Sequence, residues 1–163
     1  MTLVSVVIDT SVFADYYLLY PTRPERHQRA RTILKKISEL GLPVYEPFLF
    51  EIELRAVLVR RINPRQVLEI VATVLNHVNI VEEREIHDKA AETALTTGCR
   101  AVDAYYIATA RRFNAILVTN DKVMKENGLK ANIEVYYLLD DNDYYMLKKR
   151  IMRSHQHTAY PTP

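Results

Sequence analysis

Residues 100–121 constrain the fold of this chain more than any other segment. Tyr106 and two further apolar residues recur at spacings that place them on one face of a helix, and Asp103 shares that face. The apolar run 115–118 then predicts a short strand covered on both faces, and Asp121 follows it closely. A carboxylate on a buried helix face is costly unless something compensates for it. The segment therefore predicts a helix followed by a buried strand, with two acids that the fold itself does not require.

The composition is that of one soluble domain. The chain has 163 residues, 48% of them apolar, and a formal net charge of +2, which by itself does not require a nucleic-acid partner. Cys99 is the single cysteine, which excludes an intramolecular disulfide and a multi-cysteine zinc site. No apolar run approaches the roughly 18 residues of a membrane span, and Asp9 interrupts the N-terminal apolar run. We therefore expect a cytoplasmic protein with no membrane association.

Predicted strands and helices alternate along the chain, which is typical of an α/β fold with a doubly covered parallel sheet. The expected strands are residues 3–8, 42–45, 79–82, 115–118 and 133–138. The expected helices are residues 13–18, 25–40, 48–62, 64–75, 84–97, 100–113 and 122–127, and one beginning near residue 144. Only 3 glycines occur, so the glycine-rich phosphate-binding loops of the commonest nucleotide-binding folds are absent.

Two further acids resemble the first two in their placement. Asp9 directly follows the first expected strand, as Asp121 follows the fourth, and sites form at this edge of open α/β sheets. Glu53 borders the apolar stripe of the helix 48–62. Glu51 instead lies four residues before Arg55, which is the spacing of an ordinary surface ion pair. Glu53 is therefore the better site candidate of the two glutamates.

Four carboxylates gathered at one edge of a sheet would repel one another and raise each other's pKa. A divalent cation resolves that conflict, and an all-oxygen ligand set favours Mg²⁺ or Mn²⁺ over zinc. Such an ion lowers the pKa of water and stabilises a leaving oxygen, which predicts attack of water on a phosphodiester without a protein nucleophile. Ser11 and Thr119 can hydrogen-bond to these acids, although ordinary turn bonding explains them equally well. The candidate metal ligands are Asp9, Glu53, Asp103 and Asp121.

Other polar clusters have structural explanations. The acids of Asp140–Asp143 are expected to cap the helix that begins near Tyr144. His87 and Asp88 are expected at the surface. The basic residues of the helix 25–40 form a solvated face, with RNA contact as the alternative.

The order and spacing of the four acids resemble those of PIN-domain ribonucleases, particularly the compact prokaryotic VapC toxins. The matching segments are residues 9–13, 47–58, 103–108 and 119–121. The resemblance implies a PIN-like three-layer α/β fold, with a central parallel sheet of about five strands flanked by helices. Residues 1–139 would then be the nuclease domain. Residues 140–163 would be a C-terminal helical extension of the same domain, with a flexible tail from residue 154.

The resemblance also implies an activity and partners. It implies a Mg²⁺- or Mn²⁺-dependent endoribonuclease, the toxin of a VapBC-type pair, in which Asp9, Glu53, Asp103 and Asp121 hold the metal and carry catalysis. The implied partners are an RNA substrate, an antitoxin protein and a second copy of the chain in a homodimer. Sequences of the family vary at the position of Asn120, so we assign it no catalytic role.

Three other functions fit parts of this pattern. The chain could be an RNA-processing PIN nuclease outside a toxin system, or a non-catalytic PIN module that binds RNA or protein. A scaffold has no physical need for four acids, which disfavours the module. The third is another Mg²⁺-dependent α/β protein, such as a phosphatase or phospho-receiver. The segment Asp9–Ser11 lacks the second Asp that haloacid-dehalogenase phosphatases use there, and no phosphoacceptor Asp follows a middle strand.

Overall fold

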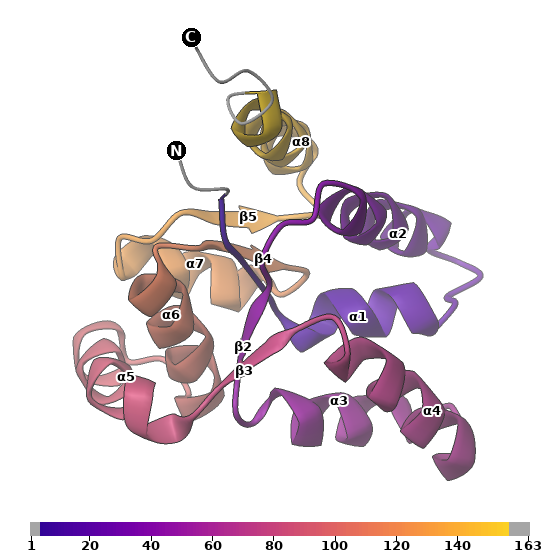
Figure 1. Cartoon of the computed structure of the whole chain (residues 1–163), viewed down its shortest axis with the longest axis horizontal. Coiled ribbons are helices and arrows are strands. Elements are labelled where there is room, and N and C mark those ends of the chain that lie inside the picture. Colours follow the sequence, from indigo (N-terminus) through magenta and orange to yellow (C-terminus); the bar gives the residue numbers. More distant parts are fainter. Residues whose placement is uncertain (1–3, 157–163) are drawn as a thin grey trace, which may run out of the picture.

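The computed structural model describes residues 4–156, with side chains as far as residue 153, and it has the expected alternation of parallel strands and helices (Figure 1). Every strand and helix predicted from the sequence is present, with ends that differ by a few residues. The elements are β1 (Val6–Ile8), α1 (Thr10–Tyr17), α2 (Pro24–Glu39), β2 (Tyr45–Pro47), α3 (Phe50–Leu58), α4 (Pro64–Leu75), β3 (Asn79–Val81), α5 (Glu83–Thr97), α6 (Ala101–Phe113), β4 (Ile116–Thr119), α7 (Lys122–Lys130), β5 (Val135–Tyr137) and α8 (Asp141–Gln156).

The expected tail begins later than predicted, because α8 continues through Gln156 and so includes the first three of the residues assigned to it. Residues 157–163 of that expected tail lie outside the described residues, as does Leu3 of the first expected strand. No helix within the described part of the chain is both long and apolar enough to cross a membrane.

The five strands are parallel but form two sheets rather than one continuous ladder. The larger sheet has the order β1-β4-β5, and the smaller one pairs β2 with β3. An isolated bridge between Val6 and Val44 connects the two sheets. The prediction of about five parallel strands is thus right in number and direction, while the continuous sheet is smaller than expected. Where the two sheets part, the side chain of Glu46 takes the place of a main-chain acceptor for the amide of Ile8.

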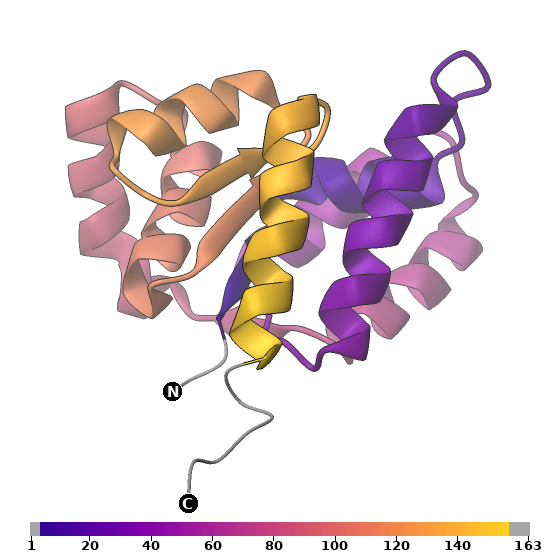
Figure 2. The same ribbon diagram turned by 90° about the horizontal axis from the view of Figure 1, so that it is seen from above.

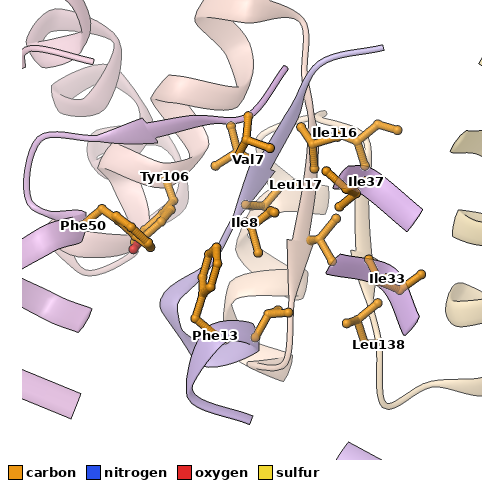
Figure 3. Close-up of a cluster of buried hydrophobic side chains, with 14 of the residues drawn as sticks. Val7, Ile8, Phe13, Ile33, Ile37, Phe50, Tyr106, Ile116, Leu117 and Leu138 are labelled. Atoms are coloured by element: carbon orange, nitrogen blue, oxygen red, sulfur yellow. The ribbon is translucent and has the colours of Figure 1, made fainter. Parts of the chain in front are cut away.

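Helices cover both faces of the strands. The helices α5, α6 and α7 lie on one side of the molecule, and α1 to α4 lie on the other, with α8 beside α2 (Figures 1 and 2). The strands contribute fully buried aliphatic side chains, which pack against Ile33 and Ile37 of α2 (Figure 3). Phe50 of α3 and Tyr106 of α6 close the core at another side of β1 (Figure 3). This packing fixes the position of the carboxyl ends of β1 and β4, where the acids lie.

Two leucines are exposed although they share the helical spacing of buried residues. Leu68 and Leu95 share the apolar periodicity of α4 and α5, yet their exposed fractions are 52% and 87%. The helix α4 packs on α3 and α5 packs on α6, so each is covered along only part of its surface. A pattern of apolar residues shows which face can be buried, whereas the width of the buried stripe depends on the neighbouring helices.

Polar residues at the starts of α4 and α8 and on the surface of α3 have structural partners. The side chain of Asn63 accepts a hydrogen bond from the amide of Gln66 at the start of α4, which is a normal helix cap. Asp140 likewise accepts a hydrogen bond from the amide of Asp143, at 2.9 Å, in the first turn of α8. Glu51 pairs with Arg55 on the surface of α3.

Candidate metal centre

Asp9 lies at the carboxyl end of β1, where its carboxylate is buried and held by two hydroxyl groups. The hydroxyls of Ser11 and Thr119 both donate to Asp9 Oδ2, at 2.6 and 2.7 Å. The same hydroxyls accept hydrogen bonds from the amides of Asn120 and Asp121, both at 2.9 Å. The end of β1 is therefore fastened to the end of β4 through Asp9. This arrangement arises because parallel strands bring their carboxyl ends to one edge of the sheet.

Burial changes the ionisation of Asp9. The pKa of Asp9 is raised from 3.8 to about 6, chiefly by loss of hydration and also by the charge of Glu53, although the hydrogen bonds from Ser11 and Thr119 act in the opposite direction. The charges of Asp9 and Glu53 therefore act on each other. The two hydroxyl groups are neutral, so they compensate the charge of a buried Asp9 carboxylate only in part.

Glu53 is held by a second pair of hydroxyls, which come from two other helices. Tyr106 of α6 donates to Glu53 Oε2 at 2.7 Å, and the hydroxyl of Thr10 in α1 lies 2.9 Å from the same oxygen. The hydroxyls of Thr10 and Tyr106 are themselves 2.6 Å apart. Burial and the charges of Glu53 and Asp9 raise the pKa of Tyr106 well above 10, so its hydroxyl stays protonated and remains a donor.

The guanidinium group of Arg100 bridges Asp103 and Asp121. Asp103 is 1% exposed in the first turn of α6, and Arg100 Nη2 lies 3.1 Å from its Oδ1. The same guanidinium nitrogen lies 3.4 Å from Asp121 Oδ2, while Asp121 Oδ1 caps α7 by accepting from the amide of Val123 at 2.7 Å. The hydrogen bond and charge of Asp103 raise the pKa of Arg100, with smaller effects from Asp121 and Glu53. Arg100 therefore links this pair of acids electrostatically to Glu53.

Glu46 is a further buried acid near Asp9, and it is not among the four acids predicted from the sequence. It lies in β2 with an exposed fraction of 0%, and its Oε1 accepts from the amide of Ile8 at 2.9 Å. Burial raises the pKa of Glu46 well above its usual value, and the charges of Asp9 and Glu53 raise it further. Its other oxygen, Oε2, has no hydrogen-bond partner within the described part of the chain.

Asp15 is also buried, but its charge is already compensated. Arg26 approaches its Oδ2 within 3.0 Å, and the side chain of Asn120 donates to the same oxygen at 2.5 Å. A buried carboxylate with a guanidinium partner needs no metal ion to balance it. Asn120 thus holds α1 against the end of β4, which is a structural use of its amide.

The donor chemistry of these acids fits a hard divalent cation, because every candidate ligand is a carboxylate oxygen. In residues 4–156, however, no three His, Cys, Asp or Glu side chains lie close enough together to hold a metal ion. The acids form two groups instead, Asp9 with Glu53, and Asp103 with Asp121 around Arg100. Arg100 is 70% exposed, so its side chain can leave these acids without disturbing the core. A cation and Arg100 are alternatives as the compensating charge for Asp103 and Asp121.

A separate hollow of about 770 Å³ lies between α1, α2 and α4. Apolar side chains such as Phe13 and Leu34 line it together with Arg31 and Lys35, and none of the four predicted acids is among its lining residues. The candidate centre therefore lies outside this hollow, at an edge of the sheet.

Sequence reasoning missed the residues that support the acids. Tyr106 was assigned to the apolar stripe of its helix, although a tyrosine on a buried face usually has a partner for its hydroxyl. Arg100 lies three residues before Asp103, a spacing that brings the two side chains together on a helix. Glu46 falls within an otherwise apolar strand, which was a usable signal of a buried acid.

The profile of the PIN domain matches residues 6–130, well over half of the chain and including all four predicted acids. The chain belongs to the PIN-domain family. The recognition of this family from its acids and their spacing is therefore confirmed. No curated protein matches the sequence of this PIN domain significantly.

Several solved structures share the fold of this PIN domain. FitAcB from Neisseria gonorrhoeae is 21% identical, with a TM-score of 0.62, and the match covers 82% of this chain and 98% of that one. VapBC-1 from nontypeable Haemophilus influenzae is 16% identical, with a TM-score of 0.60 and coverage of 83% and 98%. A toxin-antitoxin complex from Klebsiella pneumoniae is 15% identical, with a TM-score of 0.54 and coverage of 72% and 87%. At these identities the similarity establishes the fold.

Proposed function

We propose that this PIN domain is a Mg²⁺- or Mn²⁺-dependent endoribonuclease in which Asp9, Glu53, Asp103 and Asp121 hold the metal. The observation that carries the proposal is the buried and only partly compensated carboxyl of Asp9, whose charge interacts with that of Glu53 at the carboxyl edge of the sheet. A fold does not need an acid in this environment, whereas a cation site does. Membership of the PIN-domain family supports the same function.

The protein's own side chains prepare this centre. Ser11 and Thr119 fix one oxygen of Asp9, and Tyr106 fixes one oxygen of Glu53, so the remaining carboxylate oxygens are available to a ligand. A bound divalent ion supplies water of lowered pKa and neutralises charge on the phosphate. Arg100, released from its acids, is an exposed guanidinium beside the centre that can bind a phosphate oxygen of the RNA.

We further propose that the protein is the toxin of a toxin–antitoxin pair, that it binds an antitoxin protein, and that it forms a homodimer in the cytoplasm. One structure with the same fold is described as a toxin-antitoxin complex, which supports the antitoxin partner. Induced expression should arrest bacterial growth, and co-expression of the adjacent small reading frame should relieve the arrest. Growth arrest that is retained in Asp103→Asn would contradict a toxin that acts through this centre.

The nuclease itself is tested with purified protein and a labelled RNA. Cleavage should require Mg²⁺ or Mn²⁺, stop with EDTA, and fall at least a hundredfold in Glu53→Gln and Asp103→Asn. Glu51→Gln is the matched control, because Glu51 lies on the same helix and pairs with Arg55 at the surface. Equal activity in Asp103→Asn and the parent would remove the catalytic assignment. RNA binding without cleavage in any metal would instead identify a non-catalytic module.

A further inference from the structure

Glu46 occupies the point where the two sheets diverge. The amide of Val6 donates to the carbonyl of Pro43 at 2.9 Å, so β1 and the chain before β2 begin as a normal parallel pair. Two residues later, the amide of Ile8 donates to Glu46 Oε1 instead of a main-chain carbonyl. A carboxylate side chain thus fills the gap that opens between β1 and β2.

The backbone at this point needs one hydrogen-bond acceptor, whereas the carboxyl group of Glu46 has two oxygens. The amide of Ile8 requires one acceptor, and Oε1 satisfies it. The second oxygen, Oε2, is buried without a hydrogen-bond partner within the described residues. A buried polar atom that is left unpaired is unfavourable, and a regular strand would supply the amide of Ile8 with a carbonyl acceptor without burying such an atom. The fold alone does not explain an ionisable oxygen here.

Glu46 is connected to both Asp9 and Glu53 through neighbouring segments. Its hydrogen-bond partner Ile8 directly precedes Asp9, and two residues separate β2 from α3, which carries Glu53. The charges of Asp9 and Glu53 both act on Glu46, and Glu46 in turn acts on the Tyr106 hydroxyl that holds Glu53. Glu46 is therefore tied to Asp9 through the hydrogen bond at Ile8, and it brings a buried oxygen without a described partner close to the backbone that positions Asp9.

We propose that Glu46 is a fifth acidic residue of the metal centre, a positioning residue that raises the affinity of the site for its divalent cation. This inference rests on the metal centre proposed above. Glu46 acts on the cation through space and through Asp9, whose backbone it fixes by way of Ile8. A cation in the centre favours the ionised form of every nearby carboxyl group, so the charge of Glu46 adds to that of Asp9 and Glu53.

The test is isothermal titration of the full chain with MnCl₂ at pH 8, comparing the parent with Glu46→Gln. Glutamine keeps an acceptor for the amide of Ile8 and the same side-chain length, so the variant removes the charge and little else. We expect Mn²⁺ to bind at least tenfold more weakly, the range that substitution of supporting residues around a metal site commonly produces. Glu92→Gln, on the exposed face of α5, is the matched control and should keep the parent affinity.

The outcomes separate this inference from the proposed function. Parent affinity in Glu46→Gln, with Asp103→Asn weakened, would overturn the role of Glu46 and leave the metal centre standing. No Mn²⁺ binding by the parent would overturn both. If Glu46→Gln does not fold by circular dichroism, Glu46→Met, which also removes the charge in a side chain of similar length, takes its place. If Glu46 had only a structural role, its substitution would change the midpoint of thermal unfolding and leave the affinity for Mn²⁺ unchanged.

Discussion

Asp9→Asn should stabilise the metal-free protein at pH 8 while it abolishes cleavage. Burial and Glu53 raise the pKa of Asp9 from 3.8 to about 6, so the ionised side chain is disfavoured in the folded state. The difference of about 2.2 pKa units corresponds to about 3 kcal/mol of lost stability at pH values above 6. Asparagine is uncharged and can accept the hydrogen bonds of Ser11 and Thr119, so it relieves this cost.

The sign of the pH dependence follows from proton binding. Between pH 3.8 and 6 the folded protein holds the Asp9 proton more tightly than the unfolded chain does, so the stability of the parent falls as the pH rises. The gain in Asp9→Asn should therefore be about 3 kcal/mol at pH 8 and well under 1 kcal/mol at pH 4. At pH 8 this corresponds to a rise of roughly 6–12 °C in the unfolding midpoint of a chain of this size.

The measurement is urea unfolding of the parent and Asp9→Asn at pH 4 and pH 8 in the presence of EDTA. Asp88→Asn, at an exposed position of α5, is the control and should leave stability unchanged at both pH values. An Asp9→Asn variant that is less stable than the parent at pH 8 would refute the reasoning. So would a gain of equal size at both pH values, because it would have a cause other than ionisation.

Three further substitutions examine the groups around the acids and the C-terminal helix. Arg100→Ala should tighten Mn²⁺ binding about fivefold by calorimetry, since the guanidinium competes with the ion for Asp103, and unchanged or weaker binding would contradict that competition. Tyr106→Phe should lower the cleavage rate about tenfold and stability by about 1 kcal/mol, because Glu53 loses a donor; full activity would show that the hydroxyl is dispensable. Asp140→Ala should cost about 1 kcal/mol in urea unfolding through loss of the α8 cap, without any change in cleavage.

The sequence predicted the elements of the fold because the signals for them are local. The buried strand 116–119 is read from a continuous apolar run, and the burial of Asp103 follows from helical spacing alone. The division of the strands into two sheets could not be predicted in this way. Where the sheets part, the amide of Ile8 pairs with the side chain of Glu46, a residue 38 positions away, and no local pattern reports such a pairing.

For the candidate site, the sequence predicted where two of the acids lie but not which side chains surround them. The placement of Asp9 and Asp121 after strands identified the edge of the sheet, because that rule depends only on strand direction. The environment of each acid was beyond sequence reasoning, since it is made by side chains from other elements. Arg100 is the clearest case: whether a guanidinium or a cation compensates Asp103 and Asp121 is decided by rotamers rather than by the order of residues.

The junction between the two sheets has few main-chain hydrogen bonds. Asp9 follows β1 on one side of this junction, and Glu53 belongs to the helix that follows β2 on the other. In the described residues, an isolated bridge and the side chain of Glu46 connect β1 with the segment around β2. The hydroxyls of Thr10 and Tyr106, which both contact Glu53 Oε2, therefore hold α3 against α1 and α6 where no main-chain ladder does so.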